Sequence, residues 1–269
     1  MAATLEGPES PLLVAHRGAR VEAPDNTKAA FERALATPID GIEMDVQMSR
    51  DGVLMLYHDR TLHRICGRRK RVSDQNWASI FDLDAGAWFD PRFKGEPFVT
   101  FDAFLAGYAH RTRLLVEIKS RAKERKNGHV KRLAEKAVAT LTQPIYARQT
   151  HHFSILSFDP EVLKTAAKMA PQLELVLNLP DKAILLKNAL ARLQKERSER
   201  HHISGLCVKL SLLSPDVAET IVGMGKRLLT YSCNTPRQLK KASALPLNVL
   251  MTDDPRWLTS VLAQKGDSL

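Results

Sequence analysis

Two acidic residues interrupt an apolar strand pattern in the segment GIEMDVQM, residues 41–48. Glu43 and Asp45 stand two positions apart, so on a β-strand they share one face and lie about 6.6 Å apart along it. Such a pair can converge on one cation, whose oxygen ligands lie at roughly 2.0–2.6 Å. Glu117, in the segment LLVEIKS, is a third carboxylate near the end of an apolar run. Because three buried carboxylates would repel one another without a counter-charge, this pattern predicts a divalent cation site.

The candidate ligands of this cation are all carboxylate oxygens. Hard oxygen ligands without cysteine favour Mg²⁺ or Ca²⁺ over Zn²⁺, with Mn²⁺ as an alternative. Cys66, Cys207 and Cys233 are an odd number without close pairing, which predicts neither a disulfide framework nor a zinc ribbon.

Other polar residues also follow apolar runs. His16 and Arg17 come after LLVA, His58 comes after VLMLY, and Lys119 comes near the end of LLVEIKS. Each has a simpler explanation when taken alone, such as a hydrogen-bonded structural histidine or a buried ion pair. Their shared position at the carboxyl ends of predicted strands is more informative, because (β/α)8 barrels build their sites at that end.

The elements that would position these residues alternate along the chain. Short apolar runs predict strands, and amphipathic segments of helical length separate them, which indicates a parallel sheet with helical crossovers. If residues 53–57 are counted with the second strand, eight βα steps remain, the number that closes a (β/α)8 TIM barrel. An open doubly wound sheet is the alternative, weakened by the lack of a glycine-rich phosphate loop. The predicted strands are Leu12–Ala15, Gly41–Met48, Val53–Tyr57, Leu114–Lys119, Phe153–Ser157, Leu173–Leu177, Gly205–Lys209, Arg227–Tyr231 and Val249–Met251.

Several predicted helices begin with a capping residue followed by proline. Asp159-Pro160, Ser214-Pro215, Thr235-Pro236 and Asp254-Pro255 all have this pattern. The segment from Arg60 to Thr100 is predicted to be irregular. The predicted helices include Thr27–Ala36, His129–Leu141, Pro160–Lys168, Lys182–Lys195, Pro215–Met224, Pro236–Ala242 and Pro255–Gln264.

The length and composition bound the class of protein. We expect one domain over residues 1–269, because no linker, repeat or low-complexity tract divides the chain. No apolar run approaches the roughly 20 residues of a membrane span. The N-terminal sequence MAATLEGPES lacks the features of a leader, so we expect a cytoplasmic protein. The oligomeric state is not predicted.

The chain is basic, with a formal net charge of +10 and a run from Arg68 to Arg71. This charge favours an anionic partner: a nucleic acid, a phosphate-bearing small molecule or an anionic membrane surface. The run itself is interpreted first as a solvated loop and second as a phosphate-attracting rim.

Five segments resemble, in order and spacing, the successive motifs of glycerophosphodiester phosphodiesterases. They are HRGARVEAPDNTKAAFERAL, GIEMDVQMSRDGVLMLYHD, LLVEIKS, SFDPEVLKTAAKMAP and LMTDDP, and the resemblance runs from Pro11 to Leu262. It implies a (β/α)8 barrel and metal-dependent hydrolysis of glycerophosphodiesters to glycerol 3-phosphate and an alcohol. Attack by water and attack by a neighbouring glycerol hydroxyl are both compatible with the sequence.

The resemblance also implies residue roles. Two positions depart from the usual family pattern: Asp25 stands where the family has Glu, and Tyr231 stands where it has Trp. The shorter acid leaves the role of Asp25 open, whereas Tyr231 would keep an aromatic substrate wall and add a hydroxyl. The implied metal ligands are Glu43, Asp45 and Glu117, the implied acid/base pair is His16 and His58, and the implied phosphate contacts are Arg17 and Lys119.

Other functions compete with this hypothesis. Relatives on the same barrel cleave lysophospholipids or sphingomyelin-like head groups, and these would need an exposed apolar patch, for which Trp77–Phe93 is the candidate. A nucleic-acid-binding protein and an inactive scaffold are further alternatives. We expect small water-soluble glycerophosphodiesters as substrates and no nucleic-acid partner. The histidines away from predicted strand ends are expected to be dispensable: His151, His152, His201 and His202.

Overall fold

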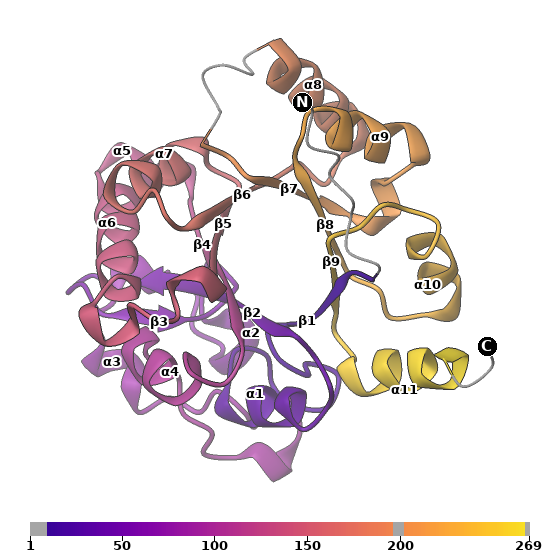
Figure 1. Cartoon of the computed structure of the whole chain (residues 1–269). Coiled ribbons are helices and arrows are strands. Elements are labelled where there is room, and N and C mark those ends of the chain that lie inside the picture. Colours follow the sequence, from indigo (N-terminus) through magenta and orange to yellow (C-terminus); the bar gives the residue numbers. More distant parts are fainter. Residues whose placement is uncertain (1–9, 196–201, 267–269) are drawn as a thin grey trace.

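Parallel strands close into a barrel, as the alternation of elements predicts (Figure 1). The computed structural model describes residues 10–195 and 202–266. In these residues nine strands form one sheet in the order β1-β9-β8-β7-β6-β5-β4-β2-β3, and pairing of β1 with β2 closes the barrel. The barrel strands are β1 (Leu12–His16), β2 (Gly41–Met48), β4 (Arg113–Ile118), β5 (Phe153–Ser157), β6 (Glu174–Asn178), β7 (Gly205–Lys209), β8 (Arg227–Tyr231) and β9 (Val249–Thr252).

The remaining strand, β3 (Leu54–Leu56), pairs antiparallel with the end of β2 and stands outside the barrel. This confirms that residues 53–57 belong with the second strand and that eight βα steps form the barrel. The open-sheet alternative is wrong because β1 pairs with both β2 and β9.

Helices surround the barrel and cover its outer face (Figure 1). Asp159, Ser214, Thr235 and Asp254 each accept a hydrogen bond from a first-turn backbone N–H, which confirms the four predicted caps. Helices α4 and α5 are absent from the sequence prediction. The helices around the barrel are α1 (Lys28–Leu35), α4 (Phe101–Tyr108), α5 (Ala122–Lys126), α6 (His129–Leu141), α7 (Pro160–Met169), α8 (Ala183–Lys195), α9 (Pro215–Gly223), α10 (Pro236–Ala242) and α11 (Pro255–Gly266).

The segment from residue 60 to 100 forms a lobe beside β3 and contains only short helices, α2 (His63–Cys66) and α3 (Ala78–Phe81). Ile80 and Phe98 are buried in a separate small core, and Trp77 and Trp88 pack against it. The apolar side chains of the lobe therefore mostly cover one another. Short 3-10 turns are η1 (Val72–Asp74), η2 (Pro91–Phe93), η3 (Pro144–Tyr146), η4 (Thr150–His152) and η5 (Leu210–Leu212).

Two expectations from the composition concern the basic run at residues 68–71 and membrane-spanning segments. Arg68, Arg69 and Lys70 are exposed on the lobe, in keeping with a solvated loop. Across the described ranges, no helix combines the length and apolar character needed to cross a membrane. Most of the N-terminal sequence on which the cytoplasmic prediction depends, residues 1–9, lies outside the described residues.

Apolar side chains fill the interior of the barrel away from the mouth, and polar side chains stand at the carboxyl ends of the strands. Alternation along each strand produces this change: on β6, for example, Val176 belongs to the apolar interior, and Asn178 follows on the same face. The polar residues thus collect at one mouth. The apolar interior cluster is Val14, Leu115, Leu156, Val176, Cys207, Leu229, Val249 and Met251.

Candidate active site at the barrel mouth

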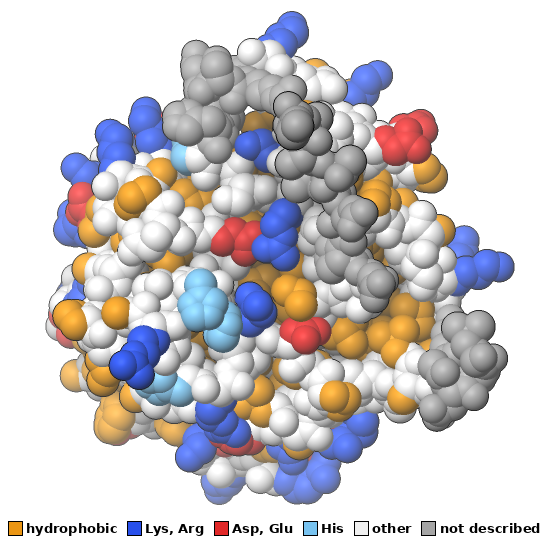
Figure 2. All heavy atoms as spheres, in the orientation of Figure 1, with side chains coloured by type: hydrophobic (Ala, Val, Ile, Leu, Met, Phe, Trp, Pro, Cys, Tyr) orange, Lys and Arg blue, Asp and Glu red, His pale blue; other side chains and the backbone are white. Residues whose placement is uncertain are grey.

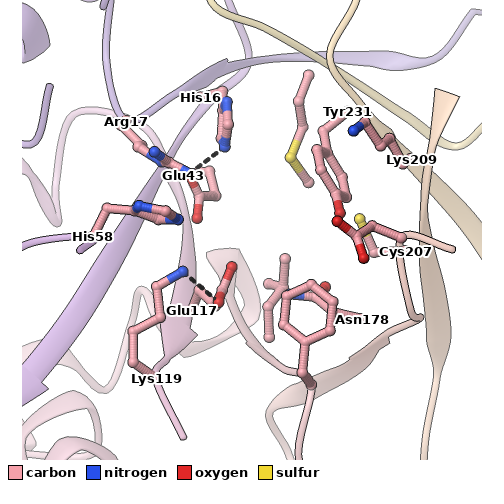
Figure 3. Close-up of a pocket in the computed structure, with 14 residues that line it drawn as sticks. His16, Arg17, Glu43, His58, Glu117, Lys119, Asn178, Cys207, Lys209 and Tyr231 are labelled. Atoms are coloured by element: carbon pink, nitrogen blue, oxygen red, sulfur yellow. Dashed lines mark hydrogen bonds and ion pairs between the residues drawn. The ribbon is translucent and has the colours of Figure 1, made fainter. Parts of the chain in front are cut away.

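A pocket with a volume of about 450 Å³ opens at the carboxyl ends of the strands. The space-filling view shows basic, acidic and histidine side chains around this mouth (Figure 2). Asp45 is fully buried beside the pocket. The other predicted site residues all line it: His16, Arg17, Glu43, His58, Glu117, Lys119 and Tyr231 (Figure 3).

Three carboxylates form a compact cluster in this pocket. Strand register explains the cluster, because Asp45 of β2 stands opposite Glu117 of β4. One oxygen from each of Glu43, Asp45 and Glu117 lies within 4.8 Å of the others, and all three residues are buried.

The electrostatics of this cluster fit a bound cation. Burial, followed by the nearby Asp45 carboxylate, raises the pKa of Glu43 well above its usual value. The Oε2 atom of Glu43 is buried and has no hydrogen-bond partner. A divalent cation would satisfy this atom and offset the repulsion, so the donor set suits a hard metal ion.

Two basic side chains contact the cluster. The Lys119 Nζ lies 2.6 Å from Asp45 Oδ1 and donates to Glu117 Oε1 at 2.5 Å. The Nε of Arg17 lies 3.0 Å from Asp45 Oδ2. Burial opposes ionisation of Asp45, but Arg17 and Lys119 hold the pKa of its carboxyl well below the usual value. Asp45 is therefore ionised, while both cations also face the pocket where an anionic ligand would lie.

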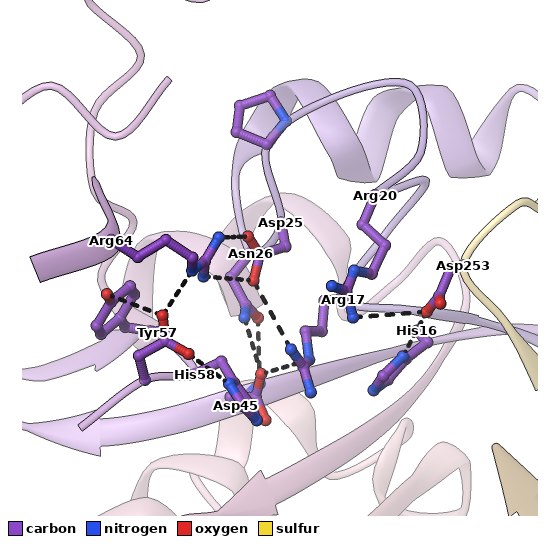
Figure 4. A network of polar contacts seen from close by, with 12 residues as sticks. His16, Arg17, Arg20, Asp25, Asn26, Asp45, Tyr57, His58, Arg64 and Asp253 are labelled. Carbon is purple, nitrogen blue, oxygen red and sulfur yellow. Dashed lines mark hydrogen bonds and ion pairs between the residues drawn. The ribbon is translucent and has the colours of Figure 1, made fainter. Parts of the chain in front are cut away.

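His16 is held by a carboxylate that sequence reasoning missed. Its Nδ1 lies 2.6 Å from Asp253 Oδ1 (Figure 4), while its Nε2 lies 3.9 Å from Glu43 Oε2. Burial, with the nearby Arg17, lowers the pKa of His16 to about 4, so the imidazole is neutral at neutral pH. Despite burial, hydrogen bonding to His16 holds the pKa of Asp253 down at about 2. The available signal was the position of Asp253 directly after β9, the strand that pairs with β1.

His58 has an equivalent carboxylate partner. Its Nδ1 lies 2.8 Å from Asp59 Oδ1. Gln47, next on the polar face of β2, donates to the backbone carbonyls of Tyr57 and Asp59 at 2.6 and 2.8 Å and so fixes the segment that carries His58. The alternation of polar residues on β2 therefore positions both the carboxylates and this histidine.

Asp25 does not belong to the carboxylate cluster. Arg64 donates to both of its carboxylate oxygens at 2.9 and 3.1 Å, and the same guanidinium donates to Asp59 at 2.5 Å (Figure 4). The Asp25–Arg64 pair thus links the lobe to the mouth of the pocket. Arg64 also holds Asp59, the carboxylate partner of His58. Asn26, the neighbour of Asp25, contacts the cluster instead, since its amide donates to Asp45 Oδ2 at 2.9 Å.

The opposite wall of the pocket comes from β5 to β8. Figure 3 shows Tyr231 and Asn178 across the pocket from His58. The Tyr231 ring lies 5.9 Å from that of His16, which gives the aromatic wall that the sequence predicts. Phe158 and Lys209 also line this wall, and sequence reasoning missed Asn178, Phe158 and Lys209. Residues from the first half of the chain therefore supply the three clustered carboxylates and both imidazoles, and residues from the second half face them.

The other histidines lie elsewhere. His151 and His152 are in η4, directly before β5, which places them at the amino end of the barrel strands. His202 precedes β7, and His201 lies outside the described residues.

Known proteins share this chain's sequence pattern and fold. A glycerophosphodiester phosphodiesterase of Caldanaerobacter subterraneus subsp. tengcongensis is 28% identical over 258 residues, 95% of this chain and 99% of that protein. The structure of an Oleispira antarctica phosphodiesterase in complex with the product sn-glycerol-3-phosphate superposes with a TM-score of 0.78, at 22% identity over 94% of this chain and 97% of that chain. The structure of a glycerophosphodiester phosphodiesterase from Agrobacterium tumefaciens superposes with a TM-score of 0.68, at 25% identity over 93% of this chain and 100% of that chain. Residues 16–256 match the model of the Glycerophosphoryl diester phosphodiesterase family, and the chain therefore belongs to this family of phosphoric diester hydrolases.

Proposed function

We propose that this chain, as one catalytic domain, hydrolyses glycerophosphodiesters to glycerol 3-phosphate and an alcohol with a divalent cation held by Glu43, Asp45 and Glu117. The observation that carries the proposal is the meeting of these carboxylates with two carboxylate-bound imidazoles in one pocket. Mg²⁺ and Ca²⁺ suit the oxygen ligands best, with Mn²⁺ as the alternative.

Positive charge is the first requirement of this reaction, because a phosphodiester anion repels a nucleophile. When bound, the cation would offset the charge on the non-bridging oxygens. Arg17 and Lys119 line the same pocket and would bind those oxygens as charge-assisted hydrogen-bond donors. Asp45 holds both side chains at the pocket floor, so little reorganisation is needed when the substrate enters.

Proton transfer is the second requirement, because an alkoxide is a poor leaving group. His16 is neutral and its Nδ1 faces Asp253, which leaves Nε2 to accept the proton of the attacking hydroxyl. His58 would carry the proton that the departing alcohol takes up, with Asp59 stabilising its imidazolium form.

A substrate panel tests this function. With added Mg²⁺, Ca²⁺ or Mn²⁺, the protein is expected to convert glycerophosphocholine and glycerophosphoethanolamine into glycerol 3-phosphate, with phosphorus NMR identifying the products. A cyclic nucleotide should remain intact, since its phosphodiester carries no glycerol. Exclusive cleavage of the nucleotide would contradict the substrate class, and a gel shift at physiological salt would support the nucleic-acid alternative.

Asp253 should act as a positioning residue for His16. Asp253→Asn keeps the size of the side chain but removes the charge that orients the imidazole and stabilises its protonated form, so kcat should fall about 10- to 100-fold with little change in KM. The adjacent Asp254 is the matched control, because it caps α11. Asp254→Ala should lower the free energy of unfolding by about 1 kcal/mol and leave kcat in place. Equal kcat in wild type and Asp253→Asn would contradict the positioning role.

A further inference from the structure

A second cavity lies in the lobe, apart from the active-site pocket. It has a volume of about 500 Å³ and lies between the turn that joins β2 to β3, the basic run at residues 68–70 and the segment around α3. Figure 1 shows β3 and α3 outside the ring of barrel strands. No residue lines both this cavity and the active-site pocket, so the two are separate spaces. We call this space the lobe cavity.

Positive charge dominates the lobe cavity. Its lining includes four cations, Arg50, Arg68, Arg69 and Lys70, whereas Asp74 is the one acid among the lining residues, which leaves a net charge of +3. Within residues 10–195 and 202–266, none of these four cations forms an ion pair with a carboxylate. A concave surface lined by one sign of charge raises the local concentration of the opposite ion. The lobe cavity should therefore attract anions.

The guanidinium groups of two arginines are held in place by neighbouring acceptors. Arg50 Nε donates to Asn76 Oδ1 at 2.9 Å, and Arg68 donates to the backbone carbonyl of Ser79 at 2.8 Å. Since a guanidinium has five N–H donors, each of these side chains keeps several for a ligand. A guanidinium fork matches the paired oxygens of a phosphate, so the lining suits a phosphate-bearing ligand.

The backbone of the basic run is also fixed. Arg71 pairs with Thr61 in an antiparallel bridge, and the side chain of the buried Gln75 donates to the Arg71 carbonyl at 3.0 Å. The Gln75 carbonyl accepts a hydrogen bond from the backbone N–H of Arg50 at 2.8 Å, which joins the turn after β2 to the same wall. Because these contacts already order the wall, its backbone needs little reorganisation when an anion binds.

We propose that the lobe cavity is a second anion site, which binds a ligand carrying two phosphate groups. One phosphomonoester carries about −2 charge at most near neutral pH and would leave the lining partly uncompensated, whereas two phosphates can match it. A free diphosphate metabolite and a lipid head group with two phosphates share this chemistry. A single-stranded nucleic acid fits less well, because no aromatic side chain lines the cavity for its bases to stack on. The site is independent of the reaction at the barrel mouth.

Pyrophosphate is the probe for this site. Calorimetric titration of the protein without divalent cations should show binding at low ionic strength that weakens as NaCl is added, because salt screens exposed charges. Inorganic phosphate should bind at least about 10-fold more weakly, since it carries less charge. Absence of pyrophosphate binding to the wild type, or equal affinity for the two anions, would overturn the inference.

Two double variants separate the lobe cavity from the active-site pocket. In the described part of the chain the side chains of Arg69 and Lys70 form no hydrogen bond, so Arg69→Gln/Lys70→Gln should fold normally. It should bind pyrophosphate about 20-fold more weakly, since each cation near a phosphate contributes about fivefold. Arg92→Gln/Lys94→Gln is the matched control, because both residues are exposed on the same lobe and do not line the cavity.

The control variant removes the same charge and should keep the wild-type affinity. Unchanged affinity in Arg69→Gln/Lys70→Gln would overturn the inference and assign the pyrophosphate to the active-site pocket. Equal losses in both double variants would also overturn it, because the effect would then come from the net charge of the chain. Both variants should hydrolyse glycerophosphocholine at the wild-type rate.

A vesicle measurement identifies the source of the phosphates. Cosedimentation is measured with phosphatidylcholine vesicles that contain phosphatidylinositol bisphosphate. Vesicle binding that pyrophosphate displaces and Arg69→Gln/Lys70→Gln loses would support the site with a lipid head group as ligand. Pyrophosphate binding without vesicle binding would support it with a free metabolite. A DNA duplex that binds more tightly than pyrophosphate at physiological salt, and that the double variant releases, would overturn the inference in favour of a nucleic-acid surface.

Discussion

His16→Ala should lower kcat by about 10²- to 10⁴-fold, the range over which a positioned general base contributes. The reason is that Ala removes the imidazole whose Nδ1 is oriented by Asp253 and whose Nε2 faces the carboxylate cluster. His58→Ala should produce a loss in the same range. Steady-state kinetics with glycerophosphocholine should show the loss mainly in kcat, with a smaller change in KM.

His151→Ala is the control for this prediction. His151 is exposed in η4, at the end of the barrel away from the pocket, so this variant should keep wild-type kcat. Retention of near-native turnover by His16→Ala would show that the imidazole has only a structural role. Equal losses in all three variants would instead indicate damage to the fold, which circular dichroism would detect.

Removal of the divalent cation should have a comparable effect on activity. Chelator-treated protein is expected to lose phosphodiesterase activity by about 100-fold or more, because a Lewis acid contributes several kcal/mol to stabilisation of the transition state. Added Mg²⁺, Ca²⁺ or Mn²⁺ should restore it. Glu43→Gln should reproduce the loss even with metal present, because Gln replaces an ionised ligand by a neutral one.

Thermal unfolding provides a second measurement of the same site. Metal should raise the Tm of the wild-type protein, since a ligand bound only by the folded state stabilises that state. Glu43→Gln should show little of this increase. Without metal, its stability should be equal to or above that of the wild type, because the substitution removes one of the mutually repelling buried carboxylates. Full activity in metal-free protein would contradict the role of the cluster.

The sequence was sufficient to predict the barrel and the main cluster because both follow from local periodicity. Apolar runs and proline-capped helices define the βα units, and the spacing of Glu43 and Asp45 puts them on one face of β2. The sequence also makes β4 the next barrel strand after β2, and the structure supplies the register that places Asp45 opposite Glu117. For the strands and helices named from the sequence only the boundaries differ, by one or two residues, whereas helices α2 to α5 were not named.

The parts that the sequence did not predict depend on long-range closure. Asp253 is 237 positions from His16, and the two meet only because β9 pairs with β1. The Asp25–Arg64 contact likewise depends on how the lobe folds back over the mouth. Asn178 and Phe158 carried no local signal, since one asparagine at a strand end and one phenylalanine in a loop fit many environments.

The division of the pocket between two halves of the chain has an evolutionary consequence. The three clustered carboxylates and both imidazoles precede Ser120, whereas Phe158, Asn178, Lys209 and Tyr231 come from the half that follows. Tyr231, Ser232 and Asp253 contact His16, whereas Phe158, Asn178 and Lys209 line the pocket on strands or segments that carry none of the groups assigned to bond cleavage. Descendants of this gene can therefore acquire new preferences through changes in β5 to β7 while inheriting the reaction from β1 to β4.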